Sequence, residues 1–328
     1  MLRKTLKFVR SWALLFSMGA GILGYFIYAA IPGLAPTRPY ALAAVEFLQP
    51  LLIFVMLFLT FCKVNPRHLR MRPWYWALLG VQGGVFALLG LLVMQLPAGG
   101  LRIVLEGAMI CFICPVATAA AVVTRRLGGS PSHITTYTIL CNLMVAVMIP
   151  VMVPLVHPHP GLSVFNAMML ILGKVFPLLL LPLFLAFLVR WLSPKLHFAL
   201  TRLRDLPFRL WVVALFLAIA VTMRYIMHSH LTLLTGLGLL AAALVGCLAQ
   251  FAIGWAVGDR YGERTTAGQA LGQKNTVFAI WIGYTFFTPV TSVVGGFYSL
   301  FHNIVNSIQL HSAAKKDAKK LAQVKKTL

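Results

Sequence analysis

The chain has 328 residues, of which 60% are apolar and only 10% are charged, and its mean hydropathy is +0.89. Soluble globular proteins carry about 25% charged residues, so this composition excludes a water-soluble enzyme. The formal net charge is +22, from 28 lysines and arginines against six acids, and its meaning depends on where these charges lie.

Ten apolar segments follow one another along the chain, separated by short polar breaks. Crossing the hydrocarbon layer takes roughly 20 apolar residues in an α-helix, and the segments are of about that length. None of the breaks is long enough for a soluble domain. The sequence therefore predicts an all-α polytopic membrane protein, with spans at 11–33, 41–62, 73–97, 101–125, 133–156, 166–193, 207–228, 232–257, 264–287 and 289–312.

The basic residues gather in alternate connections between these segments. Most lie on the side of the N-terminus, whereas the opposite side has Arg38, Arg102 and Arg224. Positively charged loops stay in the cytoplasm, so both termini are predicted to be cytoplasmic, in the inner membrane if the source is bacterial. This distribution explains the net charge, so we predict no nucleic acid as a partner. The basic tail 313–328 is expected to lie near anionic lipid.

Five cysteines all lie within or at the end of apolar spans, where a free cysteine behaves as a small hydrophobic residue. Cys111 and Cys114 have the spacing of a redox or metal pair. No second pair or nearby histidine completes such a site, so packing is the preferred interpretation. We predict no metal and no cofactor.

Two of the spans carry helix breakers or polar residues at membrane depth. Span 101–125 contains Pro115, followed by small residues and Thr118. Span 264–287 contains five consecutive breaking or polar residues: Gly272, Gln273, Lys274, Asn275 and Thr276. Non-helical backbone at this depth survives only where it lines a cavity or is buried in protein.

These two spans are the fourth members of two five-helix halves, at 1–156 and 157–312. Because five is odd, the second half is inverted relative to the first. Paired interrupted helices at corresponding positions of inverted halves indicate the binding site of a secondary transporter.

Polar stripes at helical spacing lie on the fifth and tenth spans. In the fifth, the stripe is Thr135, Thr138 and Asn142, for which interhelical hydrogen bonding and a lining role are equally open. In the tenth, His302 and its neighbour Asn303 favour a lining role. That stripe consists of Ser299, His302, Asn306 and Gln309.

Four separated segments resemble the bile acid:sodium symporter family, in the family's order. The segment Gln49-Pro-Leu-Leu-Ile-Phe-Val-Met-Leu-Phe is similar to its second helix, and Cys114-Pro-Val-Ala-Thr-Ala to its C-P-x-x-T-A crossover. Gly272-Gln-Lys-Asn275 stands where the family has G-x-Q-N, and Tyr298-Ser-Leu-Phe-His-Asn303 resembles the start of its last helix. The resemblance implies a panel domain and a core domain, crossed discontinuous helices 4 and 9, and an organic anion bound between the domains.

The chain departs from the family at its sodium ligands. Sodium-coupled members have Ser-Asn where this chain has Ala120 and Ala121, and their glutamate and glutamine align with Ala270 and Lys274. A sodium site needs several oxygen ligands, usually including a carboxylate. We therefore predict no sodium at these positions.

Lys274 is the most informative single residue, because an ammonium group near the bilayer centre is costly unless it is paired, solvated or functional. Because Lys274 lies some ten residues into the span, its side chain is poorly placed to extend its ammonium group to the membrane surface. Two functional interpretations stay open. Its amine replaces the sodium ion as a fixed charge, or burial disfavours its charged form so that it carries a proton during transport. A second lysine, Lys174, is expected to snorkel outward or to pair with Glu46 or Glu106.

The resulting prediction is a sodium-independent transporter of a small organic anion, working by alternating access and possessing no catalytic activity. Thr118, Asn275 and Asn303 would hydrogen-bond the solute, His302 would donate or exchange a proton, and Lys274 would supply charge or coupling. A membrane-embedded sensor or enzyme is the alternative. Further residues expected to line the site are Gln273, Thr276, Thr138, Asn142 and Asn306.

Overall fold

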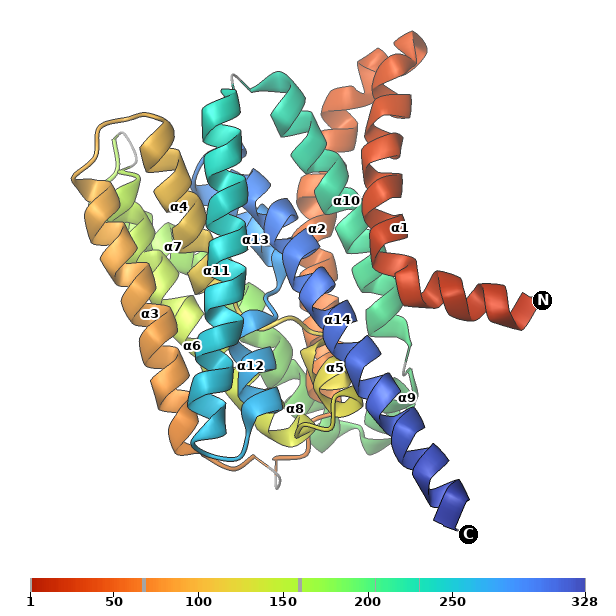
Figure 1. Ribbon diagram of the computed structural model, residues 1–328. Coiled ribbons are helices and arrows are strands. Elements are labelled where there is room, and N and C mark those ends of the chain that lie inside the picture. The colour runs from red at the N-terminus through yellow and green to blue at the C-terminus, as the bar shows by residue number, and fades with distance from the viewer. Residues whose placement is uncertain (1, 67–68, 159–160, 204, 230, 328) are drawn as a thin grey trace.

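The computed structural model describes all residues except 1, 67–68, 159–160, 204, 230 and 328, and it describes no side chains for 2–15, 314 and 316–327. Within the described residues the regular elements are helices, and strand pairing is confined to one isolated bridge. The helices pack as an elongated bundle, with the C-terminal end of the chain projecting at one end (Figure 1).

Several helices are long and apolar enough to cross a membrane, which confirms a multi-pass helical membrane protein. A sixth span results if the bent pair α7 (Val164–Leu179) and α8 (Leu181–Leu192), inclined by 41°, is counted as one. Of the ten predicted spans, length and composition therefore support five or six within the described residues. The five are Pro32–Cys62, which joins η1 (Pro32–Thr37) to α2 (Arg38–Cys62), α3 (Pro73–Met94), α6 (Pro131–Val156), α10 (Leu206–His228) and α11 (Leu233–Asp259).

The two spans with central polar residues are each divided into shorter helices. Span 101–125 consists of α4 (Gly100–Ile113) and α5 (Ala120–Arg126), and span 264–287 consists of α12 (Arg264–Gly272) and α13 (Thr276–Phe286). Both helix breaks lie where the sequence places proline, glycine and polar residues. The remaining helices are α1 (Leu2–Ala30), α9 (Pro194–Arg202) and α14 (Pro289–Thr327).

Local sequence explains where several helices begin. Proline occupies an early position in α3, α6 and α9, where its missing N–H leaves no hydrogen bond unmade. Side-chain oxygens cap other first turns: Ser163 Oγ accepts from the N–H of Asn166 in α7, and Thr232 Oγ1 from that of Thr235 in α11.

The broken helices lie in the interior of the bundle. Helix α4 packs against α3, α11 and α14, and α12 packs mainly against α11 and also against α6. Helices α1, α2 and α10 form a neighbouring group in which α10 contacts both α1 and α2 (Figure 1). The breaks are therefore surrounded by protein.

Glycine permits the close packing of α11 on α12. A Cβ atom on Gly254 would lie 2.6 Å from the Ala267 carbonyl oxygen and 2.8 Å from Gly268 Cα. One on Gly258 would lie 2.7 Å from the Glu263 carbonyl oxygen. These obstacles are backbone atoms, and Gly254 and Gly258 form the small-xxx-small pattern that brings membrane helices together.

Gly254→Ala is expected to destabilise the protein by about 2 kcal/mol, because the added methyl group forces α11 and α12 apart. The measurement is the free energy of unfolding of the purified protein in detergent mixtures. Gly84→Ala on α3 is the matched control, since nothing lies within 4 Å of its added Cβ. Equal stability of the two variants would contradict the role assigned to this contact.

Candidate functional site

The two broken helices meet at their breaks. Val116, between α4 and α5, and Lys274, between α12 and α13, form an isolated antiparallel bridge. The Ala117 N–H donates to the Gln273 carbonyl at 2.9 Å, and the Asn275 N–H donates to the Pro115 carbonyl at 2.8 Å. We call this junction, residues 114–119 with 273–275, the crossing.

A glutamine on α3 binds the free carbonyl groups at the end of α4. Gln82 Nε2 donates to the carbonyls of Ile113 at 3.1 Å and Cys114 at 3.2 Å. Gln82 Oε1 accepts from the Tyr137 hydroxyl on α6 at 3.2 Å. The last carbonyls of a helix have no partner within the helix, and a buried one is costly unless another group bonds it. Gln82 and Tyr137 are both fully buried, so the protein itself supplies that partner.

A second glutamine and tyrosine connect the two broken helices. Gln250 Nε2, on α11, lies 3.1 Å from both the Cys111 carbonyl and the Tyr298 hydroxyl, to each of which it donates. That hydroxyl, on α14, donates in turn to the Gly272 carbonyl at 2.9 Å. The sequence analysis missed Gln82 and Gln250, although an isolated glutamine in an apolar span is a recognisable signal.

The side chains at the crossing are bonded much less completely than its backbone. Lys274 is 1% exposed, and its Nζ has no hydrogen-bond partner among the described residues. The same holds for Asn275 Nδ2 and, at the start of α13, for Thr276 Oγ1. On α14, outside the crossing, both ring nitrogens of the buried His302 also lack a partner among the described residues. Gln273 Oε1 is a further buried acceptor without a partner in this part of the chain. At the crossing itself, polar side-chain atoms of Gln273, Lys274 and Asn275 are thus buried without a partner among the described residues.

Among the described residues, no acidic side chain acts on the Lys274 ammonium. Its titratable neighbours are the thiols of Cys111, Cys114 and Cys141, and a thiol is only a weak acceptor. Asn275 Oδ1 caps α13 by accepting from the Phe278 N–H at 3.2 Å, so the partly positive N-terminus of α13 begins beside the lysine. This arrangement favours a negatively charged group.

Thr118 and Thr138 line a small cavity whose lining does not include Lys274. They border a cavity of about 10 Å³ between α2, the crossing and α6, whose other hydroxyl groups come from Thr60 and Thr135. This volume is close to the minimum for one water molecule. Thr138 Oγ1 donates back to the Ile134 carbonyl at 2.8 Å, which leaves its lone pairs free to accept.

Three predicted site residues make contacts within or between helices. The Asn142 amide donates to the Leu179 carbonyl of α7 at 3.4 Å, and the Asn303 amide donates to the Ser299 carbonyl of its own helix at 2.7 Å. Asn306 Oδ1 accepts from Gln269 Nε2 of α12 at 3.0 Å. Interhelical bonding therefore describes Asn142 and Asn306 in this structure.

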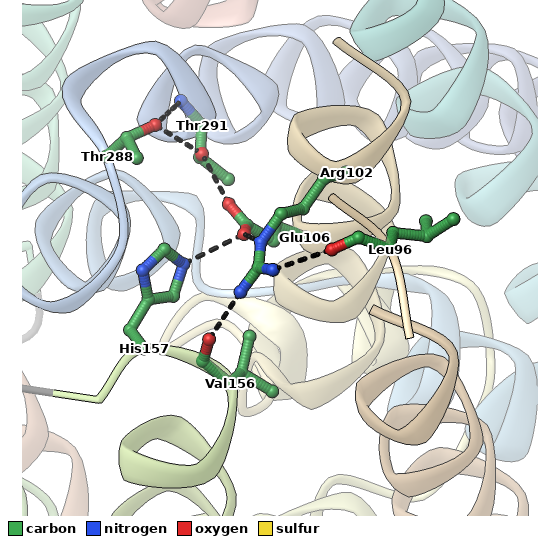
Figure 2. Close-up of polar contacts among 7 residues, drawn as sticks. All are labelled: Leu96, Arg102, Glu106, Val156, His157, Thr288 and Thr291. Carbon is green, nitrogen blue, oxygen red and sulfur yellow. Dashed lines mark hydrogen bonds and ion pairs between the residues drawn. The ribbon is translucent and has the colours of Figure 1, made fainter. Parts of the chain in front are cut away.

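A second polar cluster surrounds Glu106 on α4 (Figure 2). Glu106 is 1% exposed, and its Oε1 lies 3.1 Å from Arg102 Nε and 2.9 Å from His157 Nε2. Its Oε2 accepts from the Thr291 hydroxyl of α14 at 3.3 Å. Arg102 also donates to the Val156 carbonyl at the end of α6. The cluster therefore connects α4, α6 and α14.

This cluster changes the interpretation of Lys174. The sequence leaves open pairing with Glu46 or Glu106, but Glu106 forms its ion pair with Arg102 of α4 itself, and His157 Nε2, at the end of α6, lies 2.9 Å from its Oε1. The Lys174 ammonium instead lies 5.8 Å from the centre of the Phe286 ring, in a cation–π contact.

Compared with known protein families and with curated proteins, the chain matches no family model and no curated protein. The class that the fold defines is a multi-pass helical membrane protein, in which two helix breaks are joined by an antiparallel bridge between Val116 and Lys274.

Proposed function

We propose that this protein is a secondary active transporter that moves a small organic anion by alternating access, with its binding site at the crossing. The observation that carries the proposal is a contrast. The backbone of both breaks is bonded to protein groups. In contrast, the buried side chains of Lys274, Asn275, Thr276 and His302 have polar atoms without a partner among the described residues.

The unpartnered groups favour an anion with several acceptor oxygens. A lysine ammonium has three donors and an asparagine amide has two, and both kinds of donor suit a carboxylate. Leaving a buried polar group unsatisfied costs roughly 1–3 kcal/mol, and more for a charged one. A bound anion would remove that cost, which supports placing its charge beside Lys274.

We also propose that the chain consists of two related, inverted halves, 1–156 and 157–312, followed by a basic tail at 313–328. Two glutamine–tyrosine pairs support it. Gln82 and Tyr137 lie on the helices before and after α4–α5, and Gln250 and Tyr298 lie on the helices before and after α12–α13. The same pairing around each broken helix is what two related halves would produce.

In this proposal, anion transport is not coupled to sodium. The side chains of Ala120, Ala121 and Ala270 contain no oxygen, whereas the family that the sequence resembles has sodium ligands at these positions. Lys274 then acts either as a fixed charge or as the carrier of a proton. His302 exchanges a proton, Thr118 and Asn303 contact the solute once the bundle opens, and the panel and core domains move against each other. Both termini lie in the cytoplasm.

Uptake of labelled organic anions into proteoliposomes tests the proposal. Accumulation inside sealed vesicles above the level of protein-free vesicles is the expected result. Binding without accumulation would make the protein a sensor, and conversion of the anion by detergent-solubilised protein would make it an enzyme. Either outcome overturns the proposed transport.

A further inference from the structure

In the chain, helix α9 follows α8, the second half of the bent pair α7–α8, and precedes the candidate span α10. It lies at the end of the bundle from which the C-terminal part of α14 projects (Figure 1). None of its residues is buried. An exposed amphipathic helix next to membrane spans is suited to lie in the plane of the membrane surface.

The α9 surface combines two cations with an exposed aromatic ring. Lys195, Phe198 and Arg202 occur at i, i+3 and i+7, so they share one face of the helix. Phe198 is 63% exposed, and the Arg202 guanidinium lies 5.5 Å from the centre of its ring. Immediately before α9, Trp191 is 78% exposed. Cations beside exposed aromatic rings are typical of a helix that binds the headgroup region of a membrane.

The opposite face of α9 is fixed to the end of α2. His197 Nε2 lies 2.8 Å from the Cys62 carbonyl, and Lys63 Nζ donates to the Leu203 carbonyl at 3.4 Å. Arg190, at the end of α8, donates to the Val64 carbonyl at 2.9 Å. These bonds hold α9 in one orientation, with the Phe198 face directed away from the bundle.

We propose that the face of α9 formed by Lys195, Phe198 and Arg202 is a docking surface for anionic phospholipid. Its charge is complementary to a phosphate-bearing headgroup, and the Phe198 ring supplies the apolar contact below that headgroup. A lysine or arginine close to the membrane is attracted to an anionic membrane surface. This proposal depends on the membrane-spanning fold and not on the proposed transport.

The test compares the melting temperature of the full-length protein in phosphatidylcholine vesicles with and without phosphatidylglycerol. Phosphatidylglycerol is expected to raise the melting temperature, and Lys195→Gln with Arg202→Gln should reduce that rise by about half or more. The matched control removes two exposed cations from α5, with Arg125→Gln and Arg126→Gln, and should reduce the rise less than the α9 double variant does. An equal reduction in both double variants would overturn the proposal, as would the absence of any rise in the wild type.

Two further measurements separate membrane docking from other causes. Inorganic phosphate added to phosphatidylcholine vesicles should not reproduce the effect of phosphatidylglycerol, and if it does, the surface binds free anions instead. A fluorophore on Phe198→Cys, selective because the five native cysteines are buried, should be quenched by lipid spin-labelled near the headgroup. A folded variant without quenching would place this face in water and refute the proposal.

Discussion

Lys274→Gln is expected to lower the uptake of the labelled anion by roughly 10- to 100-fold. A hydrogen bond to a charged group contributes about 1.5–3 kcal/mol, and every 1.4 kcal/mol is a factor of ten in affinity. The amide of glutamine keeps a donor but not the charge, so loss of uptake in a folded variant assigns the effect to the ammonium. The measurement is the initial rate of uptake into proteoliposomes, with sodium and proton gradients imposed separately.

The same assay separates the two roles left open for Lys274. Lys274→Arg keeps a positive charge that does not titrate in proteins. If the lysine carries the proton, the arginine variant loses uptake driven by a proton gradient but retains anion exchange. If the lysine is a fixed charge, wild type and Lys274→Arg exchange anions alike without any gradient. Uptake driven by sodium in the wild type would contradict the interpretation of Ala120, Ala121 and Ala270.

Gln82→Leu is expected to destabilise the protein by roughly 3 kcal/mol. The substitution leaves the carbonyls of Ile113 and Cys114 and the hydroxyl of Tyr137 without their partner, and each unsatisfied buried group costs about 1–3 kcal/mol. Gln95→Leu provides the matched control, because Gln95 is exposed just after the same helix. The free energy of unfolding in detergent mixtures is measured for both variants.

A Gln82→Leu variant as stable as Gln95→Leu would show that the end of α4 does not depend on this side chain. If the variant is folded at low temperature, its uptake should also fall, because the crossing is held in place partly through Cys114. Normal uptake with normal stability would remove Gln82 from the account of the site.

The sequence predicts the helix breaks well, because the reason for them is local. Pro115 cannot continue a helix, and a run that includes Lys274 and Asn275 is too polar to face lipid. Both breaks lie at those residues in the structure, and the all-helical fold follows from the composition. The number of spans is less well predicted, since broken or bent segments such as α7 and α8 do not qualify individually by length.

The sequence does not predict which groups the buried polar side chains bond. Gln82 reaches a carbonyl 31 residues away and Gln250 one 139 residues away, so their roles depend on how the helices pack. Glu106 is similar, because its histidine partner lies at the far end of α6. Asn303 is predicted to contact the solute, yet in the structure its amide donates to a carbonyl of its own helix. That choice of rotamer cannot be read from residue spacing.

Equilibrium binding of a labelled organic anion to the purified protein tests the central claim most directly. The ligand is the anion that proteoliposomes accumulate best, and the variants are Lys274→Gln and the surface control Arg126→Gln. The account predicts saturable binding that is weakened at least tenfold by Lys274→Gln and unchanged by Arg126→Gln. Binding of wild-type affinity to folded Lys274→Gln would contradict the assignment of the crossing as the anion site.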